Sequence, residues 1–488
     1  MRQYDLSVWA MPITAKKPNS LQIEEFIIER IQNRTVQPHE GIPSHRTLAR
    51  LNKVNRNTAL RAYTKLIATG WLTHSKGSKA CVADPLPSDS RKSRPSSMPE
   101  MLPLTPGLNR HSEARAETDN GQGFISVGLP FIDKVYWPQR IVSKYVREFS
   151  RSNTGLATPQ KQHGIHSQSI QTAILQQLNL RSFSIRIDHL LVIRGRSECM
   201  RAIFKALCAP SDTVINTSPS DPLINSVLHE CEMNIIALDA VQNDFISQLE
   251  EIIIKKRIMA VYIRPNCCYP ECRNLDEASC SRLVELAKKY QFYIVEEDDD
   301  HEFWWGKYPF MPLAHYAHGG FVIHCAALSR VSPYMQNLRI VVAPAQFIEI
   351  LKSIPNAHYG YRDFSEEKAI SRFLVNSELL WFSRQAKAAK QKDLKNLHEL
   401  LQLQLGDYIS YDLPESGTAL WIRFPAKTDL VTLIELLKSD GQVIRSVISR
   451  VKPEQPIDHM RLDFGRFDMR ECRQAAIKLR SLLKKKRK

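Results

Sequence analysis

The stretch IPSHRTLARLNKVNRNTALRAYTKLIATGWL, residues 42–72, decides the fold of the N-terminal part of the chain. Its apolar positions recur at helical spacing in two short segments, and Asn52 and Lys53 lie at the turn between them. Ser44 has the residue type and place of an N-cap for the first segment, and Asn55 for the second. The pattern predicts a helix-turn-helix.

The flanking residues extend this motif to a winged helix. Residues 21–31 carry apolar side chains at helical spacing and predict a preceding helix. Residues 71–73 and 80–82 predict two short strands around the cationic tip SKGSK, residues 75–79. Because lysines at such a tip suit phosphate contacts, residues 21–84 are predicted to be a winged helix-turn-helix DNA-binding domain of the α+β class.

The first turn of the predicted third helix is polar. Arg56, Asn57 and Thr58 occupy it, and Arg61 follows one turn later. Recognition helices read bases in the major groove through their N-terminal ends. Arginine pairs bidentately with guanine and asparagine with adenine. A winged helix used only for protein contact is the alternative, and the common face of these side chains argues against it.

Three shared patterns carry a family resemblance: PS-x-R-x-LA, then V-x-RNT-x-x-RAY-x-x-L-x-x-x-GWL, then GS-x-x-x-V. In these residues the region resembles the GntR-type winged helix, although the family usually has Ser or Thr where this chain has Asn55. The resemblance implies DNA contacts at nine positions: Ser44, Arg46, Asn55, Arg56, Asn57, Thr58, Arg61, Lys76 and Gly77.

The rest of the chain divides by composition. Residues 85–120 are rich in Pro, Ser and charge and predict a flexible linker. Beyond it, strand-like runs alternate with amphipathic patterns, which predicts a mostly parallel sheet covered by helices. The predicted strands are 189–193, 213–217, 260–263 and 292–297, and predicted helices include 198–208 and 275–290. The predicted parts are an N-terminal extension (1–20), the winged helix (21–84), the linker (85–120), an effector and dimerisation domain (121–483) and a basic tail (484–488).

The composition restricts the class of protein. A formal net charge of +16 favours a polyanionic partner. Ten cysteines in 488 residues, without secreted-type spacing, do not predict a disulfide scaffold. Residues 1–20 lack the apolar core of a signal peptide, and no apolar run is long enough to span a membrane. We expect a cytoplasmic bacterial protein that is associated with the nucleoid when it binds double-stranded DNA.

Six segments of the large part follow a second family's order: GLPFIDKVYWP (128–138), LLVIRGRSECMRAIFKALCAPSDTVINTSPSDP (190–222), IRPNCCYPECR (263–273), YIVEEDDDHEF (293–303), FVIHCAALSRVSPYMQNLRIVVAP (321–344) and MRLDFGRFDMRECRQAAIKL (460–479). This part resembles the aminotransferase-like domain of the MocR subfamily, whose fold is that of type-I pyridoxal-phosphate enzymes. The resemblance implies an α/β domain with a small C-terminal α/β subdomain, a head-to-tail homodimer, and an effector role for a small molecule of unknown identity.

Transamination in this fold needs a lysine amine that forms an aldimine with pyridoxal phosphate. The resemblance places Arg330 at that position, and no lysine occurs between Lys307 and Lys352. A guanidinium stays protonated and cannot be this nucleophile. The domain is therefore predicted to be catalytically inactive and to carry no covalent pyridoxal phosphate. The other positions that match the family's cofactor pocket are Arg196, Ser197, Asp221, Glu297, Asp299, Ser329, Arg339 and Arg461.

Several alternatives stay open. Arg196, Arg330 and Arg461 predict a cationic pocket, so non-covalent binding of pyridoxal phosphate or another anion remains an option. A second hypothesis is a pyridoxal-phosphate-binding regulator or an active aminotransferase with a non-standard site. A third is a thiol or metal sensor through Cys267, Cys268 and Cys272, joined by Cys325 or His324.

Residues 296–302 form an acidic run, EEDDDHE, at the end of a predicted strand. Successive carboxylates on a strand point to opposite faces, so we expect a strand end with a solvated acidic loop rather than a metal cage. The cysteines lack a second C-x-x-C pair at zinc-finger spacing. We therefore expect them to be small buried apolar side chains, and we predict no metal site.

Overall fold

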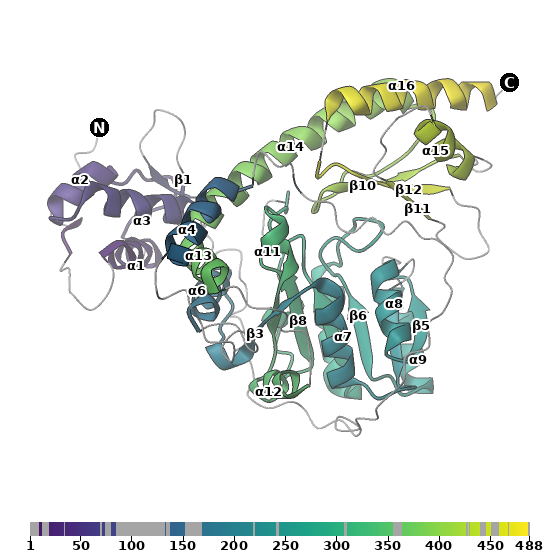
Figure 1. Ribbon diagram of the computed structural model, residues 1–488, viewed down its shortest axis with the longest axis horizontal. Helices are drawn as coiled ribbons and strands as arrows, with labels where there is room; N and C mark the ends of the chain where they lie inside the picture. Colours follow the sequence, from purple (N-terminus) through teal and green to yellow (C-terminus); the bar gives the residue numbers. More distant parts are fainter. Residues whose placement is uncertain are drawn as a thin grey trace. The chain divides into compact units, whose positions relative to one another are not determined.

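The computed structural model (Figure 1) separates into two compact units. One comprises residues 1–94 with 370–384, and the other comprises residues 95–369 with 385–488. The structure describes residues 9–11, 19–33, 35–68, 71–73, 80–83, 132, 137–151, 168–217, 220–240, 244–306, 310–354, 364–425, 428, 430–439, 446–449, 458–466 and 468–486. The predicted linker and the tip of the wing lie outside these residues.

The N-terminal unit contains a winged helix. Its elements are α1 (Asn19–Gln32), α2 (His45–Leu51), α3 (Arg56–Ala68), β1 (Leu72–Thr73) and β2 (Cys81–Val82). Helices α1 and α2 both pack against α3, and β1 pairs with β2 in antiparallel register. One apolar core, which includes Ile23, Ile27 and Leu66, joins the helices to the hairpin. The predicted winged helix-turn-helix is confirmed.

Trp9 lies in the predicted N-terminal extension but belongs to this core, where it is 5% exposed. The Asn52 side chain fixes its backbone, because Nδ2 donates to the carbonyl oxygens of Trp9 and Leu48, both at 3.0 Å. Its Oδ1 accepts from the Met11 amide at 2.7 Å. The winged-helix core therefore begins before residue 21.

The second unit is built on a seven-stranded sheet with the order β3-β9-β8-β7-β6-β4-β5. Strand β9 is antiparallel to both of its neighbours, and the other pairs are parallel, as predicted. The strands are β3 (Leu190–Arg194), β4 (Thr213–Thr217), β5 (Asn234–Leu238), β6 (Ala260–Ile263), β7 (Tyr293–Glu297), β8 (Val322–Ala327) and β9 (Leu338–Val342).

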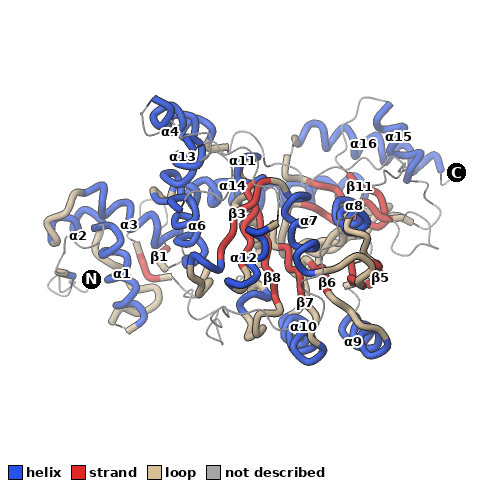
Figure 2. Tube along the Cα trace, turned by 60° about the horizontal axis from the view of Figure 1, so that its bottom comes forward, coloured by secondary structure: helices blue, strands red, loops and turns tan. Residues whose placement is uncertain are grey.

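Helices cover the sheet in two groups. Helix α7 contacts α8 and α12, whereas α9 contacts α10. Figure 2 shows α9 and α10 on the side of the sheet away from α7 and α8. The helices of this part are α4 (Gln139–Arg151), α6 (Gln168–Leu180), α7 (Arg196–Leu207), α8 (Pro222–Glu230), α9 (Phe245–Lys255), α10 (Glu277–Tyr290), α11 (Pro333–Asn337), α12 (Ala345–Ser353) and α13 (Phe364–Val375).

A smaller α/β subdomain follows, with its own three-stranded sheet in the order β10-β12-β11. Leucines from the second half of α14 pack with this sheet, α15 and α16 in one apolar cluster. No described helix has the length and apolar character needed to cross a membrane. The elements are α14 (Glu378–Leu405), β10 (Ala419–Arg423), α15 (Leu430–Ser439), β11 (Ser446–Ser449), β12 (His459–Asp463) and α16 (Met469–Lys486).

A buried imidazole fixes the turn before β8. His318 is fully buried, and its Nδ1 accepts hydrogen bonds from the amides of Gly320 at 3.1 Å and Val322 at 3.3 Å. Both bonds need an unprotonated Nδ1. Burial lowers the pKa of His318 from 6.5 to about 4.

We predict that His318 makes stability depend on pH. Its folded pKa lies below its unfolded value, so stability is complete above pH 6.5 and is lost as the pH falls towards 4. The expected loss by pH 4.5 is about 2–3 kcal/mol. His318→Asn keeps an acceptor near the Nδ1 position without titrating, and should remove this part of the pH dependence in urea unfolding. Equal pH dependence in both proteins would contradict the assignment.

Candidate functional site

The candidate DNA-binding surface lies at the start of α3. Arg56, Asn57 and Arg61 are exposed, and Thr58 is half-buried. The Asn55 side chain caps the helix, because its Oδ1 accepts from the Asn57 amide at 2.8 Å. The first turn therefore presents its polar side chains to solvent.

Helix α2 contributes the exposed residues Ser44 and Arg46. The Ser44 hydroxyl accepts from the Thr47 amide at 3.1 Å, so it is the predicted N-cap of this helix. Ser44 and Asn55 thus have structural roles in addition to the DNA contacts predicted for them. Lys76 and Gly77 lie outside the described residues.

The predicted cofactor pocket lies at the carboxyl ends of the parallel strands. Glu297 is the last residue of β7, Arg196 begins α7 after β3, and Asp221 precedes α8 after β4. Ligands of open α/β sheets bind at this edge.

Glu297 is the centre of a buried ion-pair network. Arg196 donates to both of its carboxylate oxygens, from Nε to Oε1 at 2.7 Å and from Nη2 to Oε2 at 2.6 Å. Arg339 Nη2 donates to Oε1 at 2.8 Å, and the Tyr262 hydroxyl donates to Oε2 at 2.6 Å. Burial would raise the pKa of Glu297, but Arg196 and Arg339 outweigh burial and hold the pKa below its usual range. Glu297 is therefore an anion whose acceptor positions are used within the protein.

Both arginines of this network contact a second carboxylate. Arg196 Nη2 lies 2.8 Å from Asp221 Oδ2, and Arg339 Nη1 lies 2.7 Å from Asp299 Oδ1. The same Asp299 oxygen accepts from the Ala327 amide at 2.9 Å. Three carboxyl groups thus surround two guanidinium groups.

Arg330, which the sequence resemblance matches to the family's lysine, is 1% exposed and pairs with Asp300 through Nη1. Its Nη2 donates to Thr418 Oγ1 at 3.0 Å. Arg264 Nη2 lies 3.0 Å from the other oxygen of Asp300. Burial would raise the pKa of Asp300, but Arg330 and Arg264 outweigh burial and lower the pKa. Asp300 is thus an anion held by two guanidinium groups.

The two predicted pocket serines also bond within the protein. Ser329 Oγ donates to Glu302 Oε1 at 2.7 Å, and the Arg330 amide donates to Glu302 Oε2 at 2.6 Å. Ser197 Oγ donates to Glu198 Oε2 at 2.9 Å. Both hydroxyl groups are therefore engaged by neighbouring acids.

Two predictions about charge are wrong. Arg196 and Arg330 do not make the pocket cationic, because carboxylates neutralise both. The acidic run is not solvated, because residues 296–300 are at most 1% exposed. Glu296 pairs with His324 and Asp298 pairs with Arg181, whereas Glu297, which points to the opposite face of the strand, pairs with Arg196 and Arg339. Among the described residues, no group of three or more His, Cys, Asp or Glu side chains is placed to hold a metal ion.

Arg461 on β12 faces the loop that follows β6. Its Nη1 lies 2.6 Å from Cys272 Sγ and 3.1 Å from the Pro270 carbonyl oxygen. Cys267, Cys268 and Cys272 are buried, as predicted. Cys325 instead lies with its Sγ 3.4 Å from Cys199 Sγ, and His324 is bonded to Glu296.

Four important partners were not found from the sequence: Tyr262, Arg264, Asp300 and Thr418. Tyr262 and Arg264 interrupt the apolar run AVYIRP, which is the one local signal that points to buried polar side chains there. Thr418 comes from a segment 88 positions away from Arg330 and has no local signal.

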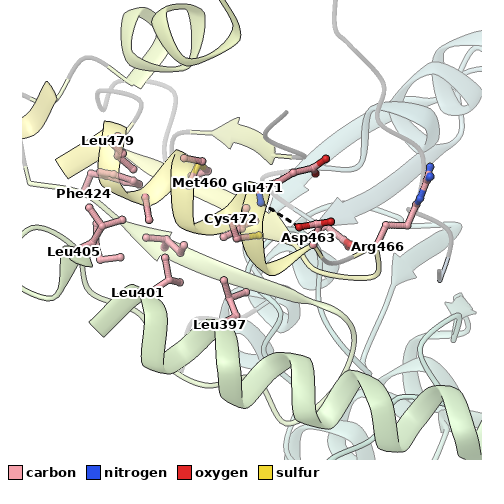
Figure 3. Close-up of a pocket in the computed structure, with 16 residues that line it drawn as sticks. Leu397, Leu401, Leu405, Phe424, Met460, Asp463, Arg466, Glu471, Cys472 and Leu479 are labelled. Carbon is pink, nitrogen blue, oxygen red and sulfur yellow. Dashed lines mark hydrogen bonds between the residues drawn. The ribbon is translucent and has the colours of Figure 1, made fainter. Parts of the chain in front are cut away.

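An apolar cavity lies in the C-terminal subdomain, apart from these residues. Figure 3 shows Leu397, Leu401 and Leu405 of α14 facing it, with Met460 on the opposite wall. Its volume is about 70 Å³, too small for a cofactor, and none of the predicted pocket residues lines it.

Known proteins resemble both the winged helix and the large α/β domain of this chain. Residues 19–82 match the family described as "Bacterial regulatory proteins, gntR family". An HTH-type transcriptional regulator of Bacillus subtilis, YisV, is 22% identical over 86% of this chain and 87% of its own length. The probable rhizopine catabolism regulatory protein MocR of Rhizobium meliloti is 20% identical over 96% of this chain and 94% of its own.

Solved structures resemble the second unit. An archaeal alanine:glyoxylate aminotransferase superposes with a TM-score of 0.65 at 18% identity, over 75% of this chain and 92% of its own. LysN, the α-aminoadipate aminotransferase of Thermus thermophilus, was solved with N-(5'-phosphopyridoxyl)-L-leucine and gives a TM-score of 0.63 at 14% identity, over 73% of this chain and 90% of its own. The chain contains a GntR-family helix-turn-helix domain and resembles MocR-type regulators over nearly its whole length. Its large α/β domain has the fold of aminotransferases.

We predict that Glu297→Gln strongly destabilises this regulator. Two buried guanidinium groups would lose their shared carboxylate, and breaking a buried pair costs about 3–5 kcal/mol. The measurement is urea unfolding of the full chain. The matched control is Glu250→Gln, whose carboxylate pairs with Arg282 at 3.1 Å and Lys289 at 3.4 Å on the surface, and whose loss should change the free energy of unfolding far less. Similar losses in both variants would contradict the central role of Glu297.

Proposed function

We propose that this regulator binds DNA in a sequence-specific manner through α2, α3 and the wing, and that its aminotransferase-like domain has no catalytic activity. The observation that carries the first part is the exposed polar first turn of α3. The second part rests on Arg330, which stands at the position of the aldimine-forming lysine and pairs with Asp300. The domain then has dimerisation and ligand sensing as its remaining roles.

The proposed DNA contacts keep the nine predicted positions. Arg56 and Asn57 stand at the N-terminal end of α3, where recognition helices contact base edges, and Arg61 lies one turn further on. Ser44 and Arg46 are exposed on α2 and suit phosphate contacts. Lys76 and Gly77 of the wing are assigned by resemblance to the same backbone role. The charge of Lys76 adds affinity without sequence preference.

We also propose a head-to-tail homodimer, as the family resemblance implies. A dimer would place two winged helices on paired half-sites. The linker of residues 85–120 would join each winged helix to the dimer. The effector of such a dimer would be a small molecule, and its identity is left to experiment.

Pyridoxal phosphate does not fit the described residues as an aldimine-forming cofactor. The carboxylate that would face the cofactor's ring nitrogen is Glu297, and it already accepts two bonds from Arg196 and one from Arg339. Arg196 stands where the resemblance places the phosphate-binding residues. Since these two anchor groups contact each other directly, there is no room between them for a ring. Non-covalent binding of an anion would require Arg196 to leave Glu297, or would have to use Arg461.

We expect Arg56→Ala to relax sequence preference. Loss of a bidentate base contact should cost about 1–3 kcal/mol on the operator and little on random DNA. The matched control is Lys76→Ala, which should weaken binding on all sequences and reduce the salt dependence. The measurement is a salt series of binding isotherms on the protein's own upstream region and on a scrambled duplex, with a footprint to count half-sites. Equal losses on both duplexes for Arg56→Ala would contradict the recognition helix, and a single half-site would contradict the dimer.

We expect the wild-type chain to form no aldimine. Added pyridoxal phosphate should give no shifted absorbance band and no borohydride-stable adduct. Arg330→Lys supplies an amine but leaves Arg196 on Glu297, so labelling should be weak. Arg196→Ser combined with Arg330→Lys should label more, at residue 330. A stoichiometric adduct on the wild type would favour the active-aminotransferase alternative over our proposal.

A further inference from the structure

The loop between β6 and α10 contains three cysteines that the proposed function does not use, and two of them lie together. Cys267 and Cys272 are 1% and 3% exposed and form one cluster with Ala419. The loop is closed by backbone bonds, because the Cys268 amide donates to the Arg273 carbonyl and the Cys272 amide donates to the Cys268 carbonyl, both at 2.7 Å. These bonds hold Cys267 and Cys272 at the same end of the loop.

The backbone at both cysteines is unusual. Each has a φ of 60°, in the left-handed region that side-chain-bearing residues rarely adopt. A Cβ on Gly417 would lie 2.5 Å from Cys267 Sγ, so only glycine at this position leaves room for that sulfur. Backbone strain of this kind is found at functional sites, where surrounding structure holds it in place.

A guanidinium lies against this thiol pair. Arg461 Nη1 is 2.6 Å from Cys272 Sγ and favours its thiolate, but burial and the hydrogen bond with Cys267 outweigh this charge and raise the pKa of Cys272. The hydrogen bond with Cys272 lowers the pKa of Cys267, and Arg461 and Arg264 act in the same direction. Burial also raises the pKa of Cys268, so Cys267 is the thiol of this loop that ionises most readily.

We propose that Cys267 and Cys272 are a reversible modification site that a peroxide oxidises to a disulfide. The thiolate of one cysteine attacks a peroxide oxygen, the O–O bond breaks, and a sulfenic acid and one water form after proton uptake. The second thiol then attacks this sulfur, the S–S bond forms, and a second water leaves. The two thiols lose two electrons and the peroxide gains them. A thiol reductant reverses the reaction by exchange.

A second thiol pair in the unit is less accessible. Cys199 and Cys325 have their sulfurs 3.4 Å apart, but both are 0% exposed, between α7 and β8. Cys272 is instead flanked by the half-buried Glu271 and the exposed Arg273. Cys199 and Cys325 serve as an internal control for the loop pair.

The test is thiol mapping on the full chain. Trypsin releases residues 258–273 as one peptide, because Arg264 precedes a proline, and this peptide contains Cys267, Cys268 and Cys272. The reduced protein should give three alkylated cysteines after unfolding in iodoacetamide. Protein treated with hydrogen peroxide should give one, at Cys268, and dithiothreitol should restore three. Three alkylated cysteines in the 258–273 peptide after peroxide would overturn the proposal, whether or not a disulfide joins Cys199 to Cys325.

Two variants sharpen the result. Cys268→Ser keeps the pair and should go from two alkylated cysteines to none on oxidation. Cys272→Ser removes one partner, so peroxide should form no disulfide in this peptide: Cys268 should stay alkylatable, and Cys267 should be trapped as a sulfenic acid that dithiothreitol reduces. If Cys272→Ser does not fold, Cys268→Ser and the wild type still decide the outcome. Loss of alkylation at Cys268 in the wild type would show a different pairing and would overturn this one.

Discussion

A carboxylate buried away from water needs positive charge beside it, and the interior of the α/β unit depends on that constraint. Glu297 satisfies it with Arg196 and Arg339, and Asp300 satisfies it with Arg330 and Arg264. In the aminotransferase fold this place is where a cofactor is held. Here the protein's own guanidinium groups neutralise Glu297 and Asp300.

The same pairing makes the changes in the pocket depend on one another. Arg196 would be an unpaired buried cation without Glu297 and Asp221, and Asp300 would be an unpaired buried anion without Arg330 and Arg264. Leaving such a charge alone is far more costly than replacing the whole pair. A single substitution at any of these positions would therefore leave a buried charge without its partner. One fold can accommodate different sets of charges in this way, because its architecture does not depend on any one site.

The sequence predicts the winged helix well because its signals are local. Ser44 and Asn55 cap helices a few residues away, and the apolar spacing of α1 and α3 describes one common core. The alternating strands and helices of the sheet are found for the same reason. The pocket is predicted less well, because its charges are decided by pairing across the fold. Nothing in the sequence near Arg330 predicts its hydrogen bond to Thr418. Nothing near residues 296–300 predicts that arginine, histidine and amide groups would pair with these acids and allow them to be buried.

The hydrogen bonds between the Asn52 side chain and the backbone of Trp9 and Met11 have a practical consequence for preparing shorter fragments of this protein. The family match begins at residue 19, but the tryptophan that closes the core lies ten positions earlier. A fragment cut at the family boundary would expose apolar surface on α1 and leave the buried amide of Asn52 without two of its three partners. A fragment that keeps this core intact must therefore include Trp9.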